Sequence, residues 1–429
     1  MNHATGYDRI RPLTVEFAKR LHAWLNKMTS REVSLADHES IPQLVHRLFQ
    51  DARNERATDI HIDAEDGTLC IRLRIDGVLR DVALIPARHN AQFLGHIKAL
   101  VDLDPTPLLR PASGGTLYEL DEVNVNLRVT CTPTIRGEKM SVRLLDPRRV
   151  QYTLEELGLN HEQKEKIDRW LESMAGMVLV AGATGSGKTT SLYALLHQLK
   201  SLDCSVITIE DPVEYRVDGI NQIQVHEARG ITFSEAVRAM LRLDPDFLMV
   251  GEMRDRASAE AALAASSTGR VLLSSLHSRD AAGTVTTLRN LDIQDYEITA
   301  ALELVISQRL VRRLCPDCKR EGPAPAEDRG WLEALGVTAP TTSWVASGCN
   351  NCRHTGYHRR IGVFEIWYVD EEANGLIRRH SDEKSLRHAI RESGTKSLLE
   401  DGMDKAAAGV TSLAELRRVG SYGFGISHR

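Results

Sequence analysis

The first change in the hydrophobic pattern separates a helical segment from a sheet. In the segment SIPQLVHRLFQDARNERA, the apolar residues recur at the spacing of one helix face. These residues are Ile41, Leu44, Val45, Leu48 and Phe49. We therefore expect residues 1–60 to be mostly helical.

Strict alternation of apolar and other residues follows this segment. Leu69, Ile71, Leu73 and Ile75 alternate with Cys70 and charged residues, which is typical of a strand with one buried face. The dipeptide Asp76-Gly77 then predicts a two-residue hairpin turn. The segments NVNLRVTCTPT and KMSVRLLD predict further strands. Together these elements predict a small α+β domain over residues 1–147.

Short apolar runs alternate with helical segments between residues 177 and 310. The runs are MVLVAG, SVITIED, DFLMVGE and VLLSSLH, and their alternation with helices predicts a mostly parallel sheet covered on both faces. We expect a linker at residues 148–160 and a second domain at residues 161–429. Within the second domain, a cysteine-containing subdomain is expected at 312–360 and a helical tail at 361–429.

Composition narrows the classes of protein. The chain has 429 residues, 42% hydrophobic and 26% charged, which is typical of a globular protein of two to four domains. A net charge of -5 does not favour a nucleic acid as a direct partner. No run of 18 apolar residues and no signal-peptide core occur. We expect a cytoplasmic protein that contacts membranes only through partners.

A phosphate-binding motif lies near the start of the second expected domain. The segment from Gly182 to Thr189 fits the pattern G-x-x-x-x-G-K-[ST], follows a predicted strand at 177–181 and opens a predicted helix. Backbone N–H groups of such a loop bind phosphates, Lys188 would neutralise them and Thr189 would ligate Mg²⁺. The alternative is a glycine-rich turn without a ligand. The predicted ATP-binding residues are Gly182, Ala183, Thr184, Gly185, Ser186, Gly187, Lys188, Thr189 and Thr190.

Three further strand ends deliver polar groups to the same edge of the predicted sheet. Glu252 follows the apolar run FLMV, Glu210 and Asp211 follow SVITI, and His277 follows VLLSSL. Ligands of open α/β sheets bind at the carboxyl ends of the strands, so we expect these side chains around the phosphates. Glu252 could hold Mg²⁺ through water or polarise an attacking water. The alternatives are a solvated loop glutamate and an ordinary surface histidine.

Four arginines are candidates for stabilising the charge that develops in phosphoryl transfer. Arg238 and Arg242 are spaced by four residues, on one face of a predicted helix. Arg128 and Arg143 lie in predicted strands of the first domain, which would have to close over the site. The alternative for the helical pair is two solvated side chains.

Two C-x-x-C pairs, LCPDC and GCNNC, predict a Cys₄ structural Zn²⁺ site. The long interval between the pairs requires an inserted element, which we expect to be a helix at DRGWLEALG. Redox cysteines are the alternative, although no thioredoxin-like unit surrounds them. Cys70, Cys131 and Cys204 are expected to be core residues. The predicted zinc ligands are Cys315, Cys318, Cys349 and Cys352.

Taken together, these motifs resemble the secretion ATPase superfamily, specifically the motors of type II secretion and type IV pilus assembly. The resemblance covers the chain from about residue 40. It rests on these segments: ATDIHID, RLRIDGVLR, GATGSGKTT, TIEDPVEY, LRLDPDFLMVGEMRD, TGRVLLSSLHSRDA, QRLVRRLCPDCK and CRHTGYHRRIGVFEI.

The resemblance implies an ATP-hydrolysing homo-hexamer. Each subunit would combine a PAS-like N-terminal domain with a RecA-like domain, at the cytoplasmic side of the bacterial inner membrane. The ring would drive a polytopic inner-membrane platform protein and bind a cytoplasmic docking protein. Glu252 matches the family's catalytic base, Glu210 and Asp211 match its Mg²⁺ and water ligands, and the four arginines match its phosphate contacts.

The chain departs from the family pattern at several places, among them Leu243, where the family often carries a glutamine. The segment RPASGGT (110–116) stands where the family carries P-Q-D-G-R, and Arg270 replaces a histidine. These departures keep open a ring scaffold or regulator with little turnover. A retraction or DNA-uptake motor is a further alternative, which the cysteine pairs argue against. The sequence does not distinguish a type IV pilus, a conjugative pilus and a type II pseudopilus as the fibre.

Overall fold

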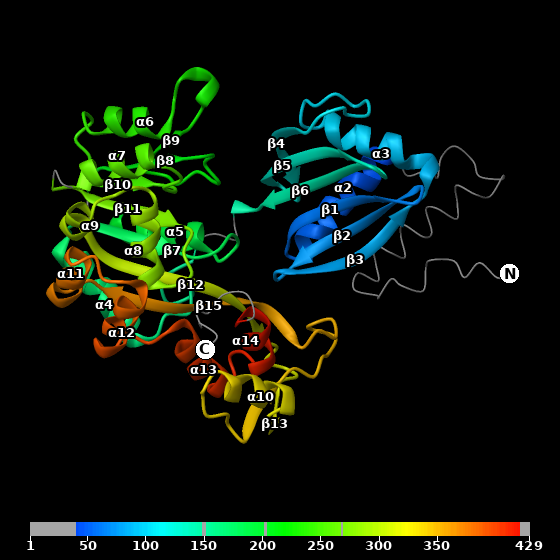
Figure 1. Cartoon of the computed structure of the whole chain (residues 1–429). Helices are drawn as coiled ribbons and strands as arrows, with labels where there is room; N and C mark the ends of the chain where they lie inside the picture. Colours follow the sequence, from blue (N-terminus) through cyan, green and yellow to red (C-terminus); the bar gives the residue numbers. More distant parts are fainter. Residues whose placement is uncertain (1–39, 148–151, 201–203, 267–268, 421–429) are drawn as a thin grey trace, which may run out of the picture. The chain divides into compact units, whose positions relative to one another are not determined.

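The computed structural model describes residues 40–147, 152–200, 204–266 and 269–420 (Figure 1). Its contacts divide the chain into two compact units, residues 1–149 and residues 150–429. The helical content that we expected before residue 40 lies outside the described residues. Across the described part of the chain, no helix has the length and apolar character that crossing a membrane requires.

The first unit is a six-stranded sheet in the order β3-β2-β1-β6-β5-β4, in which all paired neighbours are antiparallel. Two helices pack with this sheet around one apolar core (Figure 1). Its elements are α2 (Ile41–Asn54), β1 (Ala57–Glu65), β2 (Thr68–Ile75), β3 (Val78–Ile85), α3 (Ala87–Ala99), β4 (Ala112–Leu120), β5 (Val123–Thr134) and β6 (Gly137–Leu145).

Local signals explain the start of α2 and the turn between β2 and β3. Ser40 and Gln43 form a reciprocal capping box that starts α2. Asp76 and Gly77 both have positive φ, 50° and 82°, which is the conformation of the expected hairpin turn between β2 and β3. Helix α2 ends at Asn54 and β1 begins at Ala57, so the helical character that we expected up to residue 60 was placed too far along the chain.

The second unit is built on a seven-stranded sheet in the order β15-β12-β7-β11-β10-β8-β9, parallel except at β15 (Figure 1). The predicted parallel α/β sheet is therefore confirmed. The sheet strands are β7 (Met177–Ala181), β8 (Val206–Glu210), β9 (Asn221–Gln224), β10 (Phe247–Val250), β11 (Val271–Leu276), β12 (Leu302–Leu314) and β15 (Tyr357–Tyr368). Two more strands, β13 (Arg320–Pro323) and β14 (Thr342–Val345), form a separate pair.

Helices cover both faces of this sheet, and successive residues of the fully buried strand β7 point to opposite cores. Met177, Leu179 and Ala181 join one core, and Val178 and Val180 join the other. The helices are α4 (His161–Ser173), α5 (Lys188–Lys200), α6 (Phe233–Met240), α7 (Arg256–Ser266), α8 (Ala281–Asn290), α9 (Asp295–Ala301), α10 (Ala326–Ala334), α11 (Glu371–Arg378), α12 (Glu383–Glu392), α13 (Leu398–Ala407) and α14 (Leu413–Gly420).

The C-terminal part differs from the expected helical tail. Residues 357–368 form β15, a strand of the main sheet, so helices resume only at Glu371. The inserted helix between the cysteine pairs is present as α10. A separate apolar core joins α10, α13 and α14 to β12 and β15, and its members are Val311, Ala324, Leu332, Val363, Leu398, Leu399, Ala406, Leu413 and Leu416.

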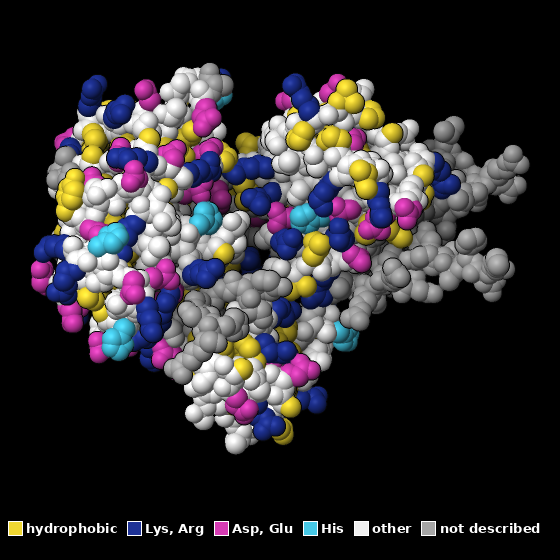
Figure 2. Space-filling view, viewed as in Figure 1, with side chains coloured by type: hydrophobic (Ala, Val, Ile, Leu, Met, Phe, Trp, Pro, Cys, Tyr) yellow, Lys and Arg dark blue, Asp and Glu magenta, His cyan; other side chains and the backbone are white. Residues whose placement is uncertain are grey.

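Charged side chains of both signs are interspersed over the face drawn in Figure 2. This mixture agrees with 54 basic and 59 acidic side chains in the whole chain.

Candidate active site and metal centre

The phosphate-binding motif lies where the sequence predicts it, between β7 and α5. Gly185 and Gly187 have φ of 76° and 92°, a conformation that side chains rarely adopt. A Cβ at Gly185 would meet nothing within 4 Å, so the loop is open on that side. Lys188 begins α5, and Thr189 and Thr190 follow in its first turn. The loop therefore has the backbone form and helix N-terminus that a polyphosphate with Mg²⁺ requires.

Lys188 is held toward the loop by its own backbone. Its Nζ donates to the carbonyl oxygens of Gly182 and Ala183, at 2.9 and 3.3 Å. Burial, and then the charge of Arg309, lower the pKa of Lys188 to about 8. A bound polyphosphate would supply the negative charge that this ammonium lacks in the protein alone.

His277 connects Lys188 to Glu252. Its Nδ1 lies 3.3 Å from Nζ of Lys188, and its Nε2 lies 3.6 Å from Oε2 of Glu252. Since an ammonium can only donate, Nδ1 accepts and Nε2 carries the proton that faces the carboxylate. Burial, followed by the charge of Lys188, lowers the pKa of His277, so the ring is neutral at pH 7. Three predicted site residues thus come together in one cluster.

Arg254 is a site residue that the sequence reasoning missed. Its Nη1 donates to Oδ2 of Asp211 at 2.7 Å, and its Nε donates to Oε1 of Glu252. One guanidinium therefore joins the carboxylates that follow β8 and β10. The segment GEMRD had indicated only the glutamate, because an arginine four residues beyond a strand is ordinarily solvated.

Glu210 is placed differently from its neighbour Asp211. Glu210 is 4% exposed and accepts hydrogen bonds from the Tyr193 hydroxyl, from Thr208 Oγ1 at 2.7 Å and from Gln222 Nε2 at 3.1 Å. With these donors satisfied inside the unit, the geometry favours a positioning role for Glu210. Asp211 is one-third exposed and remains the better candidate for holding Mg²⁺ or water.

The structure does not bring Arg238 and Arg242 into this cluster. Arg238 lies in α6, but the helix ends at Met240, so Arg242 lies in the following turn and the expected shared helix face was wrong. Both are exposed, and neither forms a hydrogen bond or an ion pair with a described residue. Arg128 and Arg143 are directly opposite each other on β5 and β6 of the other unit. Arg143 pairs there with Asp59, at 3.0 Å.

The four predicted metal ligands form one cluster. All four Sγ atoms, from Cys315, Cys318, Cys349 and Cys352, lie within 4.8 Å of one another. Three of their Sγ–Sγ distances are 3.7, 3.7 and 3.8 Å. Tetrahedral Zn²⁺ with Zn–S bonds of about 2.3 Å requires separations of about 3.8 Å, so the donor set fits zinc.

Backbone donors support the same centre. The N–H groups of Cys349 and Gly356 donate to Sγ of Cys352, at 3.1 and 3.2 Å. Such bonds stabilise a thiolate and orient it for a metal. The Zn²⁺ would tie the end of β12, at Leu314, to the chain that enters β15.

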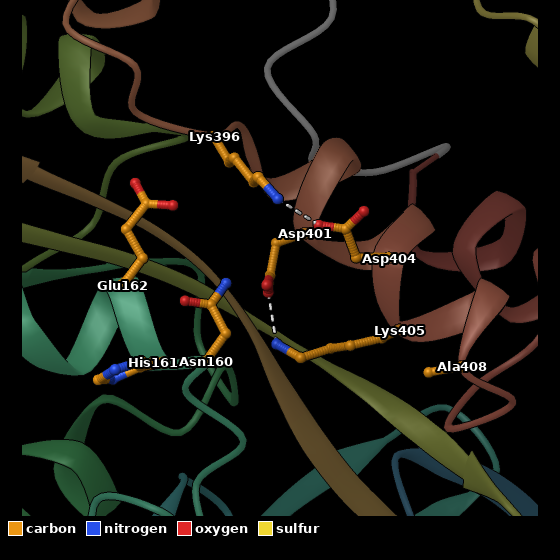
Figure 3. A pocket seen from close by; sticks show the side chains of 8 residues that line it. All are labelled: Asn160, His161, Glu162, Lys396, Asp401, Asp404, Lys405 and Ala408. Carbon is orange, nitrogen blue, oxygen red and sulfur yellow. Dashed lines mark hydrogen bonds and ion pairs between the residues drawn. The ribbon is translucent and has the colours of Figure 1, made fainter.

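A groove of about 370 Å³ between the start of α4 and α13 is distinct from both sites (Figure 3). Lys396 pairs with Asp404 at 2.7 Å, and Lys405 pairs with the buried Asp401. Asp401 also accepts from the backbone N–H of Phe364 at 2.8 Å, which fastens α13 to β15. Since these charges are paired within the groove wall, we interpret it as a structural joint between helix and sheet.

Comparison with known proteins finds a family model that spans both units. The family model described as "Type II/IV secretion system protein" matches residues 34–418. The chain is 39% identical over 384 residues to the type II secretion system ATPase E of Vibrio cholerae, covering 89% of this chain and 76% of that protein. It is 39% identical over 386 residues to type II secretion system protein E of Aeromonas hydrophila, with the same two shares covered.

Solved structures show the same fold at low sequence identity. The ATPase DotB of Legionella pneumophila matches with a TM-score of 0.63 at 20% identity, over 91% of this chain and 98% of that chain. The pilus retraction motor PilT with bound ADP matches with a TM-score of 0.54 at 22% identity, over 84% and 96%. The length of the family match and the identity to its members lead to one conclusion. This chain belongs to the type II/IV secretion system protein family.

Proposed function

We propose that this protein is an ATPase of a secretion or pilus-assembly machine. The observation that carries the proposal is the convergence of Lys188, His277 and Glu252 at the carboxyl ends of three parallel strands. Bound ATP and Mg²⁺ would supply the reacting phosphate and neutralise its charge. Lys188 and the loop amides would hold the phosphates, Glu252 would accept the proton of the attacking water, and Asp211 would hold Mg²⁺ or water.

We further propose a homo-hexameric ring that acts on a polytopic inner-membrane platform protein, with a cytoplasmic docking protein as a second partner. Support comes from the relatives named for type II secretion and from Arg238 and Arg242, for which the described residues provide no acceptor. Arg238 and Arg242 are exposed, as residues that reach a neighbouring subunit would be. The protein would then lie in the cytoplasm, peripheral to the inner membrane.

Phosphate release by the purified full-length chain tests the enzymatic claim. We expect Mg²⁺-dependent release by the wild type and none by Lys188→Ala, which loses the ammonium beside Gly182 and Ala183. Light scattering on the same sample reports whether the active species is a hexamer. Activity in a monomer at full rate would contradict the ring, and equal activity of the variant would contradict the site.

A nucleotide-binding scaffold with little turnover is the second candidate, and one observation favours it. Glu252 is paired with Arg254, so its carboxylate is not free in this conformation. Tight ATP binding without phosphate release, even with the platform protein present, would select the scaffold. A retraction motor is the third candidate, and deletion of the gene would then give excess surface fibres rather than none.

A further inference from the structure

Two residues of β12, Gln308 and Arg309, lie directly behind the phosphate loop. Strand β12 pairs in parallel with β7, and Ser307 is level with Ala181, the last residue before the loop. The next two residues of β12 therefore continue beside the loop itself. Both are buried, Gln308 at 1% and Arg309 at 6% exposure.

Gln308 contacts the phosphate loop at two points. Its Nε2 donates to the carbonyl oxygen of Ser186 at 2.8 Å. A Cβ at Gly187 would lie 3.1 Å from the same Nε2, so a side chain there would press on the amide. The phosphate loop therefore packs closely on the Gln308 side chain. The hydrogen bond from Nε2 of Gln308 fixes the orientation of the Ser186 peptide.

Arg309 donates to carbonyl oxygens of its own strand and of the turn that follows His277. Its Nη1 donates to the carbonyl of Gln308, its neighbour in β12, at 2.8 Å. Its Nη2 donates to the carbonyls of Arg279 at 2.9 Å and Ser278 at 3.3 Å, in the turn that follows His277. A Cβ at Gly182 would lie 3.0 Å from Nη1. The planar guanidinium thus spans the distance from the phosphate loop to the histidine turn.

Three buried oxygen atoms in this region lack hydrogen-bond partners among the described residues. They are Oε1 of Gln308, Oγ of Ser307 and Oγ of Ser186. Buried polar atoms are nearly always paired, so the region behind the loop has hydrogen-bonding capacity that the described contacts do not use.

We propose that Gln308 and Arg309 are positioning residues that hold the phosphate loop and the His277 turn in register. Gln308 sets the loop for phosphate binding, and Arg309 sets the distance between Lys188 and His277. This inference rests on the proposed ATPase function. The two neighbours should have different effects. Gln308 acts on the phosphate loop alone, whereas Arg309 acts between this loop and the His277 turn.

Two variants of the full-length chain separate these effects. Gln308→Met keeps the volume but loses the donor, and we expect KM for ATP and Kd for ADP to rise about tenfold with kcat nearly unchanged. Arg309→Lys keeps the charge but loses the planar fork, and we expect kcat to fall about tenfold with Kd for ADP within about threefold. Arg313→Gln, on the same strand but exposed, is the matched control and should behave as the wild type.

Melting temperature and ADP binding are measured on every variant beside the kinetics. The proposal is supported if Gln308→Met changes mainly KM and Kd, Arg309→Lys changes mainly kcat, and both melt close to the wild type. A lower melting temperature with kcat and Kd unchanged, or parallel losses in both variants, overturns it. If Arg309→Lys does not fold, a wild-type Kd for ADP in Gln308→Met is enough to overturn it. A wild type that binds ADP but releases no phosphate contradicts the proposed function instead.

Discussion

At the scale of single residues, Arg254 determines how the two candidate carboxylates are arranged. It joins Asp211 and Glu252, which follow different strands, and without a cation two carboxylates at one site repel each other. We infer that this guanidinium holds them in place in the protein without nucleotide. Its bond to Glu252 must lengthen when that carboxylate accepts a proton from water.

Replacing Arg254 by Gln tests this role. We expect kcat to fall about tenfold while KM for ATP stays within about threefold, because the loop that binds the phosphates is untouched. Steady-state phosphate release gives both constants. Arg256→Gln is a matched control, since Arg256 is similarly exposed and pairs with Glu260 and Asp292 instead. Equal losses in the two variants would show that Arg254 has no special role.

Glu365 makes stability depend on pH. Burial is the largest cause that raises the pKa of Glu365 from 4.5 to about 7, and the negative charge of Asp280 acts in the same direction. The positive charges of Arg391 and Arg387 oppose this shift. Arg309 also lies close enough to interact with the carboxyl group. The folded protein therefore binds one more proton than the unfolded chain between about pH 4.5 and pH 7. Stability from this group is full below pH 4.5 and is lost as the pH rises through 7.

Glu365→Gln removes this dependence because the amide stays neutral. Relative to the wild type, the variant should gain up to about 3 kcal/mol in unfolding free energy between pH 4.5 and pH 7. Urea unfolding of both proteins at a series of pH values measures the difference. A difference that is constant with pH would mean that folding does not shift the pKa of Glu365.

Some of the site residues could be predicted from the sequence and others could not. Lys188, Glu252 and His277 could be predicted because each follows an apolar strand, and strand ends meet at one edge of a parallel sheet. Arg254 and Arg309 could not, since their partners are distant in sequence and, for Arg309, are backbone carbonyls. Glu210 satisfied the same pattern as Glu252, yet Tyr193 and Gln222 surround it.

At the scale of elements, two of the strands that were missed, β4 and β12, have unusual sequences. Strand β4, ASGGTLYEL, carries two glycines, which have low strand propensity, and pairing with β5 overrides that propensity. Strand β12, LELVISQRLVRRL, includes buried Gln308 and Arg309, whose polarity hides a central strand. The fully apolar strand β7 was predicted at its exact bounds.

Removal of a metal ligand tests the Cys₄ centre that lies between β12 and β15. We expect one Zn²⁺ per chain in the wild type, and none in Cys315→Ser, whose buried ligand is lost. The variant should melt about 5 °C lower or more, while hydrolysis per assembled ring changes less. Cys204→Ser is the control, since that half-buried thiol lies outside the cluster. Metal-free wild-type protein of full stability would contradict the assignment.

At the scale of the whole molecule, the first unit supplies Arg128 and Arg143 as a pair. Their register places them side by side on β5 and β6, between residues that face the core. We propose that this pair stabilises phosphate charge when the unit approaches a nucleotide site. The fold of each unit follows from its own hydrophobic pattern, since each unit has its own apolar core.

Arg128→Gln measures the contribution of the first unit. We expect kcat to fall at least tenfold, because a charge-stabilising donor is lost, with little change in melting temperature. Arg136→Gln, in the exposed turn between β5 and β6, should leave kcat unchanged. Wild-type hydrolysis by Arg128→Gln would confine the chemistry to the second unit.

The central claim is that Glu252 is the base of an ATP-hydrolysing site. The most direct measurement is phosphate release by wild type and Glu252→Gln at saturating ATP and Mg²⁺, with ATP binding determined on the same samples. We predict that the variant binds ATP as tightly as the wild type and releases phosphate at least about 100-fold more slowly. Equal rates of phosphate release from the two proteins would contradict it.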